Sequence, residues 1–439
     1  MAWLISYATT FKHGSLMTKR RITSAALLGI CALWVGDLCA DALSVKAAEI
    51  AARKTSAITN ETPQPQRFIA RGASIVDLRE QKEVFFKGIG YSPYLPGETP
   101  IPHGAPGDDA RYGEHFDLLR GLGVNYLHVF PRHMPAGFFA QLDKTDLVYG
   151  QDIWLQDDAH DFLDADYQQH ALDRIKATID HAYRVGRPER LVLFSIGDEW
   201  KPESIARTDA LHRRATAFSG KHIRVSNRTA SEIALARLID AAMEYELSTY
   251  GQRHLYCHTS FTHVGPLADR YDLEVPFSSA LTPDIGDLIC LNVYIYARGV
   301  VSSPPGSVTA TPYQGYLEQL AAQSDKPIFI TQSGLSTSPI SSKPWIPWFG
   351  GNRVEDVPAR FRAIWRDLRT AKLSERFCGL SFFEFNDEWW KNGGGIADAQ
   401  TQAPTDLEEW FGIFAIGEDN RLQPKGRIPD TLREIFAEP

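Results

Sequence analysis

Near-continuous apolar runs alternate with amphipathic stretches along the chain from about residue 66 onward. Each run is rich in β-prone residues, and each following stretch carries apolar residues at helical spacing. The predicted strands span 84–91, 125–130, 147–155, 191–196, 254–258, 288–294, 327–331 and 379–385. The predicted helices span 108–121, 135–143, 165–185, 230–249, 312–323 and 355–373, and a C-terminal helical region follows. Strands that are apolar on both faces are typical of a parallel sheet covered by helices.

Eight strand–helix units predict a closed (β/α)8 barrel. The units fill residues 66–439, which is longer than the ~250 residues of a typical barrel, so we expect long βα loops. An open, doubly wound sheet is the competing fold. That fold usually has a glycine-rich phosphate loop after its first strand. The segment 87–92, Lys-Gly-Ile-Gly-Tyr-Ser, lacks the third glycine of such a loop.

The N-terminal segment predicts export. A basic cluster at 19–21 precedes an apolar run at 22–36, and Ala40-Asp41-Ala42 offers a cleavage site. The run is short for a membrane span, which needs about 20 residues. We therefore expect a signal peptide at 1–42, with Met17 as an alternative start, a linker at 43–65, and a secreted or periplasmic domain at 66–439. An uncleaved N-terminal anchor is the alternative.

Charge and cysteine usage exclude several functions. The chain has 54 acidic and 46 basic residues, for a net charge of −8, so nucleic acid is not an expected partner. No C-x-x-C pair and no H-E-x-x-H motif occurs, and we predict neither a metal nor a cofactor. The three cysteines beyond the signal segment lie in or beside strand-like runs and are expected in the core: Cys257, Cys290 and Cys378.

Polar residues gather where the predicted strands end. Asp198 and Glu199 follow the fourth strand, Tyr294 ends the sixth, and Gln332 follows the seventh. In (β/α)8 barrels, catalytic groups lie at these carboxyl ends of the strands. The eighth strand has the richest set, which is Glu384, Asp387, Glu388, Trp389 and Trp390.

These segments resemble the clan A glycoside hydrolases, (β/α)8 enzymes that cleave β-glycosidic bonds with two glutamates. In that family the acid/base glutamate ends strand four and the nucleophile glutamate ends strand seven. The resemblance is closest to the family-2 TIM-barrel type and to bacterial β-glucan-acting relatives. It rests on a first-strand segment at 85–91, an acid/base segment at 194–199 with Asp198 in the place of asparagine, a nucleophile segment at 326–334, a strand-eight segment at 383–391 and a tail at 408–414.

The nucleophile place holds Gln332 and not glutamate. A neutral amide cannot form the glycosyl ester of a retaining mechanism. Three explanations stay open. The chain is a Glu→Gln variant, or another carboxylate acts (Glu384, Asp387 or Glu388), or the protein binds carbohydrate without catalysis.

The resemblance implies a general acid at Glu199. The alternative for Glu199 is a first-turn acid of a helix that begins at Pro202. Glu388 is the candidate second catalytic carboxylate, and a salt bridge to Lys391 is its alternative. Tyr294 is expected to hold the acting carboxylate, or else to lie in the core.

Further side chains are expected to bind substrate. Trp389 could stack on a sugar ring, and Trp348 lies in an apolar loop, 345–351, that would overhang the barrel mouth. Arg132 follows the second strand, where it could bind substrate hydroxyls. Asp198, Glu384 and Asp387 complete the predicted binding set.

The sequence as a whole predicts an exported glycoside hydrolase that acts on a β-linked, glucan-type poly- or oligosaccharide. A transglycosylase on the same glycan and a non-catalytic carbohydrate-binding barrel are the alternatives. No stable membrane insertion is expected after signal cleavage.

Overall fold

The computed structural model describes residues 66–100, 104–155, 160–262, 281, 284–391 and 399–438. The predicted signal peptide at 1–42, its alternative start at Met17 and the predicted linker at 43–65 lie outside these residues. Within the described ranges, no helix combines the length and the apolar character that crossing a membrane requires.

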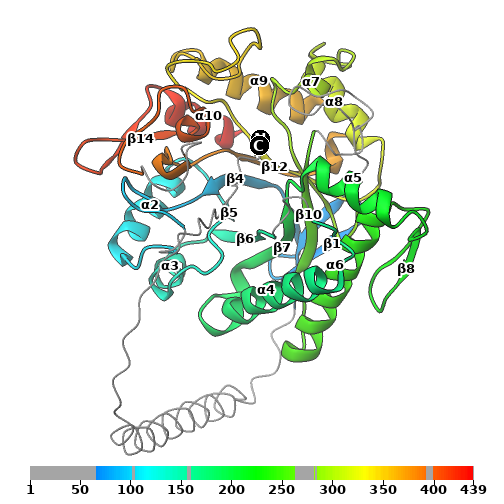
Figure 1. Ribbon diagram of the computed structural model, residues 1–439. Helices are drawn as coiled ribbons and strands as arrows, with labels where there is room; N and C mark the ends of the chain where they lie inside the picture. Colours follow the sequence, from blue (N-terminus) through cyan, green and yellow to red (C-terminus); the bar gives the residue numbers. More distant parts are fainter. Residues whose placement is uncertain are drawn as a thin grey trace, which may run out of the picture. The chain divides into compact units, whose positions relative to one another are not determined.

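Eight parallel strands form a closed barrel, which confirms the predicted (β/α)8 fold (Figure 1). All eight predicted strands are present, and neighbours in the chain are neighbours in the barrel. In order around the barrel they are β4 (Phe86–Tyr91), β5 (Tyr126–Val129), β6 (Val148–Ile153), β7 (Leu191–Asp198), β10 (Leu255–Phe261), β11 (Ile289–Asn292), β12 (Ile328–Ser333) and β13 (Phe377–Phe382).

The predicted helices are also present, with ends that shift by a few residues. They surround the barrel as α2 (Asp109–Gly121), α3 (Ala136–Leu142), α4 (Ala165–Arg184), α6 (Ala230–Tyr250), α8 (Pro312–Ala321), α9 (Val357–Thr370) and α10 (Ile428–Ala437). Local sequence sets their ends. For α6, Thr229 and Glu232 form a reciprocal capping box, and Gly251 ends the helix with φ 72°. The helix expected to begin at Pro202 is present as α5 (Pro202–Leu211), whereas α7 (Arg298–Val301) was not predicted.

A three-stranded antiparallel sheet precedes the barrel and was not predicted. It consists of β1 (Phe68–Arg71), β2 (Ser74–Asp77) and β3 (Lys82–Val84). The prediction placed residue 84 in the first barrel strand, but Val84 ends β3 and the barrel strand begins at Phe86. The side chains of Phe68 and Ile75 belong to the same buried cluster as Phe86 at the start of β4. The sheet therefore covers the amino-terminal end of the barrel.

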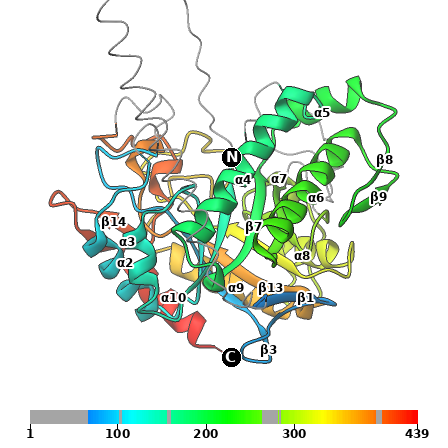
Figure 2. The same cartoon turned by 90° about the horizontal axis from the view of Figure 1, so that it is seen from below.

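Two short hairpins complete the fold. The first, β8 (Ala217–Ser219) with β9 (Arg224–Ser226), lies beside α6 at the edge of the molecule (Figure 2). The second, β14 (Phe414–Ile416) with β15 (Leu422–Pro424), follows the barrel and precedes α10. Both hairpins have three-residue strands, too short for an alternating pattern to reveal them.

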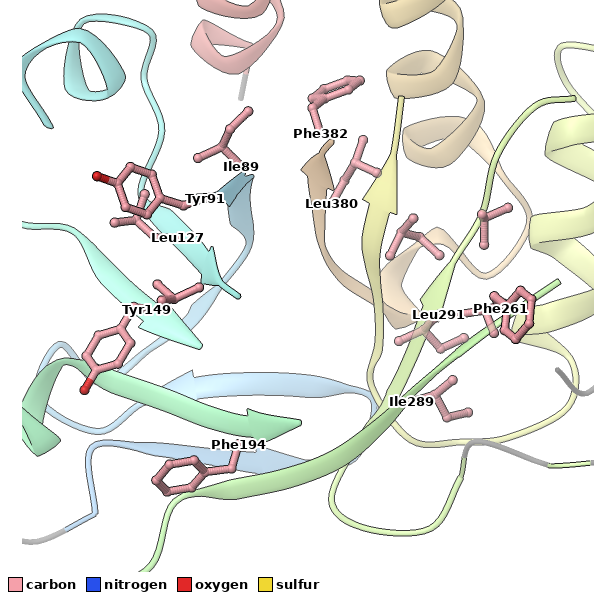
Figure 3. Packing of buried hydrophobic residues seen from close by; sticks show 14 of the residues in the cluster. Ile89, Tyr91, Leu127, Tyr149, Phe194, Phe261, Ile289, Leu291, Leu380 and Phe382 are labelled. Carbon is pink, nitrogen blue, oxygen red and sulfur yellow. The ribbon is translucent and has the colours of Figure 1, made fainter. Parts of the chain in front are cut away.

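Both faces of the barrel strands are buried. On β10, Leu255 and Cys257 belong to the cluster inside the barrel, whereas Tyr256 between them packs toward the helices. Figure 3 shows the outer set, with Ile89, Leu127 and Leu291 among the labelled side chains. This two-sided burial explains the near-continuous apolar runs. Cys257, Cys290 and Cys378 are free and buried, as predicted.

Candidate active site at the carboxyl end of the barrel

Glu199 directly follows β7 and points toward β11. The Asn292 Nδ2 atom donates hydrogen bonds to Glu199 Oε1 at 2.8 Å and to Asp198 Oδ1 at 3.3 Å. The Thr331 hydroxyl donates to Asn292 Oδ1 at 2.8 Å, which fixes the orientation of the amide. All four side chains are buried. Side chains of the neighbouring strands β11 and β12 thus hold the glutamate from one side.

The backbone of Glu199 adopts an uncommon conformation. Its φ is 47°, in the left-handed region that residues other than glycine seldom occupy. The Glu199 N–H donates to the Thr259 carbonyl on β10 at 3.0 Å, so the adjacent strand holds this conformation in place. Strained residues of this kind cluster at functional sites. The α5 helix begins only at Pro202, and the contact with Asn292 differs from the first-turn role given as the alternative for Glu199.

Gln332 occupies the equivalent position on β12. The Tyr294 hydroxyl donates to Gln332 Oε1 at 2.9 Å. The Gln332 Nε2 atom lies 3.4 Å from Asp198 Oδ2 and donates to it. Tyr294 therefore holds the residue in the nucleophile place, as the sequence suggested, but that residue is an amide. Asp198 connects Gln332 to the Asn292–Glu199 pair, so the predicted Glu199, Asp198, Tyr294 and Gln332 form one network.

Asp152 and Asp198 are buried carboxyl groups with raised pKa values. Burial raises the pKa of Asp152 to about 8, and the charge of Glu199 adds to the effect. Burial also raises the pKa of Asp198 well above its ordinary value, with contributions from Asp152 and Glu199. Asp152 is therefore mostly protonated at pH 7, and the raised pKa of Asp198 favours its protonated form. A neutral Asp198 offers a donor and an acceptor, as the asparagine of the resembled motif does.

The carboxyl groups after β13 are bound to lysines. The Lys391 ammonium lies 3.2 Å from Glu384 Oε1 and 2.6 Å from Glu388 Oε2. Burial and the Glu388 charge raise the pKa of Glu384 well above its ordinary value. Burial opposes ionisation of Glu388 too, but Lys391 outweighs it and the pKa of Glu388 is lowered. Glu388 thus forms the salt bridge given as its alternative, and its predicted catalytic role stays a prediction.

Asp387 joins the end of β13 to the C-terminal hairpin. Its Oδ1 atom lies 2.5 Å from the Lys425 ammonium and accepts from the Gly412 N–H at 3.0 Å. Its Oδ2 atom accepts from Gln402 Nε2 at 3.1 Å. Both oxygens accept from protein donors, so Asp387 stabilises the contact between these segments. Its predicted contact with substrate stays a prediction.

The remaining predicted binding residues lie outside the hydrogen-bonded network. Trp389 is half-buried in the short 3-10 helix η3 (Trp389–Lys391). Trp348 has φ 71°, and the Arg360 guanidinium stacks 3.8 Å from its ring centroid, which covers one ring face. Arg132 is exposed after β5. Their substrate contacts stay predictions.

Several residues near the site were not singled out from the sequence. They are Asn292, Asp152 and Glu408, whereas Lys391 was expected as a salt-bridge partner of Glu388. Asn292 is the last residue of β11, so the strand-end rule that selected Tyr294 could have found it. Glu408 lies in η5 (Glu408–Trp410), far along the chain, where no local signal marks it. Among the described residues, no cluster of three or more His, Cys, Asp or Glu could hold a metal ion.

A closed (β/α)8 barrel is also the fold of solved glycoside hydrolases. Solved structures of that fold superpose on this chain, which confirms the predicted resemblance at the level of the fold. No family model matches the sequence, and no curated protein matches it.

Three similar structures illustrate the likeness. A variant of Saccharomyces cerevisiae Gas2p, in complex with laminaritetraose and laminaripentaose, has a TM-score of 0.53 at 16% identity, over 85% of this chain and 68% of that one. Bifidobacterium dentium β-glucuronidase, complexed with coumarin-3-O-glucuronide, has a TM-score of 0.54 at 16% identity, over 85% and 49%. The apo β-glucuronidase of Ruminococcus gnavus has a TM-score of 0.53 at 14% identity, over 84% and 52%. This chain spans about half the length of the β-glucuronidases. At these identities the likeness shows the fold alone.

Proposed function

We propose that this protein hydrolyses β-glycosidic bonds of a glucan-type poly- or oligosaccharide, with Glu199 as the general acid. The observation that carries the proposal is the position of Glu199. It directly follows β7 with φ 47°, it is buried, and Asn292 holds its carboxyl group. The fold is shared with glycoside hydrolases, and this position is where the resembled clan carries its acid/base residue.

The chemistry requires a proton on the leaving oxygen and stabilisation of an oxocarbenium-like transition state. Glu199 donates its proton to the glycosidic oxygen as the C–O bond breaks. Asn292 and Thr331 keep the carboxyl group in one orientation, so little reorganisation is needed at the moment of reaction. Asp198 and the Gln332 amide offer neutral hydrogen-bonding groups to sugar hydroxyls beside the reacting bond.

Two observations favour a β-glucan as the substrate. The strand-eight segment resembles that of bacterial β-glucan-acting relatives, and the similar Gas2p structure holds laminari-oligosaccharides. The β-glucuronidases among the similar structures make β-glucuronides the second set of compounds to test. Transfer of the glycosyl group to a second sugar is the variant of the same reaction in which a hydroxyl replaces water.

A non-catalytic carbohydrate-binding barrel is the second candidate function. Gln332 favours it, because an amide in the nucleophile place removes one of the two carboxyls that glycosidases generally use. Binding without bond cleavage is what this candidate predicts for every glycan.

The test compares the protein with its Glu199→Gln and Gln332→Glu variants. Each is incubated with laminarin, β-1,2-glucan, aryl β-glucosides and aryl β-glucuronides, and released sugar is measured. Glu203→Gln is the matched control, because Glu203 is an exposed glutamate in the first turn of α5. We expect hydrolysis by the native chain, a loss of about 10²- to 10⁴-fold in Glu199→Gln and no loss in Glu203→Gln.

The other outcomes separate the alternatives. Activity only in Gln332→Glu indicates a chain whose nucleophile has been replaced. Oligosaccharide binding with no cleavage by any variant contradicts hydrolysis and favours the binding barrel.

We also propose that the protein is exported, from the sequence of residues 1–42. The test is the N-terminal sequence of the mature protein together with membrane fractionation. A mature chain that begins near residue 43 in the soluble exported fraction supports the proposal, and a membrane-bound chain that keeps residues 1–42 contradicts it.

A further inference from the structure

Trp345 is exposed on the loop that follows β12. Its side chain is 74% exposed, and among the large exposed apolar side chains of the described residues it is the most exposed and the only aromatic one. Single exposed aliphatic side chains are ordinary on protein surfaces, but a tryptophan ring offers a flat apolar face. The position of the loop determines which molecules this face can reach.

Hydrogen bonds tie the two ends of the Trp345 loop together. The Gly351 N–H donates to the Ser338 carbonyl at 2.9 Å. The Asn352 Nδ2 atom donates to the Ser336 carbonyl at 2.7 Å. Compact loops with paired ends are frequently functional. Because these contacts fix the backbone, little conformational entropy is lost when a ligand binds to the loop.

Prolines flank the exposed ring. Pro344 precedes Trp345 and Pro347 follows two residues later, and both are exposed. Proline fixes its own φ and restricts the backbone of the residue before it. Ile346, between Trp345 and Pro347, is buried in an apolar cluster. The loop therefore anchors itself through Ile346 and leaves the Trp345 ring in solvent.

Aromatic contacts join the same loop to the candidate active site. Phe349 belongs to a buried cluster that includes Tyr294 and Tyr296. The Phe349 ring meets the Tyr296 ring edge to face with centroids 5.4 Å apart, and Tyr296 stacks on Tyr294 with centroids 5.2 Å apart. The Tyr294 hydroxyl in turn donates to Gln332. The loop therefore packs on the site, with two tyrosine rings between it and Gln332.

Trp348, the tryptophan of this loop that the sequence selected, is less available than Trp345. It is half-buried, and the Arg360 guanidinium covers one face of its ring at 3.8 Å from the centroid. Stacking on a sugar requires an open ring face. The exposure of Trp345 leaves its ring open to such a ligand.

We propose that Trp345 is the stacking platform of a sugar subsite remote from the reacting bond, where it binds a β-glucan chain that extends from the barrel mouth. The inference rests on the proposed function and adds a subsite to it. The C–H groups of a β-linked glucose unit form apolar faces that fit a flat tryptophan ring, while the hydroxyl groups stay in solvent. Since two tyrosine rings separate the loop from Gln332, the platform contributes to the binding of long chains and not of short ones.

The experiment measures dissociation constants by titration calorimetry for native, Trp345→Ala, Trp345→Phe and Trp345→Leu proteins. The ligands are the disaccharide and the pentasaccharide of the β-1,3- and β-1,2-linked glucose series. Val308→Ala is the matched control, because Val308 is 66% exposed in the segment between α7 and α8.

We expect Trp345→Ala to bind the pentasaccharide of the preferred linkage about 10-fold more weakly and the disaccharide as well as the native protein does. Trp345→Phe keeps an aromatic face and should retain most of the affinity. Trp345→Leu keeps apolar surface without a flat face, so it should lose as much as Trp345→Ala. Val308→Ala should bind both ligands like the native protein.

Hydrolysis gives an independent measurement. With the polysaccharide of the preferred linkage, Trp345→Ala should raise KM by about 10-fold and leave kcat unchanged, since a contact remote from the reacting bond stabilises the bound substrate and the transition state equally. With an aryl β-glucoside, which is too short to reach the loop, neither KM nor kcat should change. An unchanged thermal unfolding midpoint shows that each variant folds.

Three results overturn the inference and leave the proposed function standing. The first is native affinity of Trp345→Ala for the pentasaccharide, and the second is an equal loss for the disaccharide and the pentasaccharide. The third is self-association of the native chain that Trp345→Ala abolishes without a change in glucan affinity. If the native protein binds neither oligosaccharide series, the inference and the β-glucan substrate are both wrong. Binding without hydrolysis, with the expected loss in Trp345→Ala, contradicts hydrolysis alone and supports the subsite.

Discussion

Single buried carboxyl groups set the charge of the candidate site. Asp152 lies on β6 with its Oδ1 atom accepting the Ile153 N–H at 3.1 Å, and its Oδ2 atom lacks a hydrogen-bond partner in the described structure. Its pKa is about 8, mainly because of burial. Burial raises the pKa of Asp198 as well. The raised pKa values of these two acids reduce the negative charge where three carboxyl groups lie close together.

The Asp152→Asn variant should therefore be more stable than the native protein at high pH. An unfolded aspartate ionises near pH 4, whereas Asp152 in the folded protein titrates near pH 8. Between pH 4 and pH 8 the unfolded aspartate is ionised and must take up a proton on folding, so the stability of the native protein falls as the pH rises. The asparagine side chain of the variant does not titrate, so its folding requires no proton uptake. We expect no gain at pH 4 and a gain that grows with pH to at most about 5 kcal/mol at pH 8, measured by urea unfolding.

Asp77→Asn is the control, because the stability that ionised Asp77 contributes depends on pH in the opposite direction. Burial opposes ionisation of Asp77, but its ion pair with Arg67 at 2.8 Å outweighs burial and lowers its pKa. The stabilisation by ionised Asp77 is present above pH 4 and is lost as pH falls through its folded pKa. A loss of stability in Asp152→Asn that is equal at every pH would contradict the neutral state of Asp152.

At the scale of elements, length and periodicity decided which segments were predictable. All eight barrel strands are apolar on both faces, and their helices carry an apolar stripe, so local patterns indicated both. The strands of β1–β3 have three or four residues each, and β8 and β9 have three. Such short strands form because partner strands supply hydrogen bonds, which a local pattern does not record.

A buried ion pair helps to hold the C-terminal hairpin against the barrel. The Lys425 ammonium contacts Asp387 at 2.5 Å, the Thr337 hydroxyl at 2.9 Å and the Trp410 carbonyl at 3.0 Å. Lys425 and Asp387 side chains are 5% and 0% exposed. These contacts join the segments after β12 and β13 to β15, and they also set the position of η5.

Lys425→Met should destabilise the protein by about 3–5 kcal/mol, because it leaves Asp387 buried without its counter-charge. Urea unfolding at pH 7 measures the loss. The double variant Lys425→Met/Asp387→Asn removes both charges and should recover part of it. A double variant no more stable than Lys425→Met would show that packing of the lysine stem, and not the buried charge, accounts for the effect.

At the scale of the whole molecule, the two ends of the barrel have different roles. The carboxyl end carries the Glu199 network. The amino end is covered by β1–β3, where the Phe68 and Phe86 rings meet edge to face with centroids 6.1 Å apart. In (β/α)8 proteins, the carboxyl face supports chemistry and the amino face supports stability.

Phe68→Ala should therefore reduce stability without changing catalysis. Phe68 is 3% exposed, and removing such a ring typically costs about 3–5 kcal/mol. We expect a lower thermal unfolding midpoint and, well below that midpoint, an unchanged kcat/KM or oligosaccharide affinity. Ser74→Ala, at the first residue of β2, is the milder control and should leave both quantities near native values. A reduced kcat in Phe68→Ala with a native midpoint would contradict the separation of the two ends.

The sequence by itself determined the barrel and the strand ends that carry Glu199, Asp198, Tyr294 and Gln332. Both follow from patterns within about ten residues, since a strand buried on two faces must be apolar until it reaches the mouth. Only the tertiary structure decided which charges meet. The ion pair of Lys425 with Asp387 and the hydrogen bond from Asn292 to Glu199 join segments that are distant in the chain. Electrostatic energy depends on separation in space, which spacing along the sequence does not give.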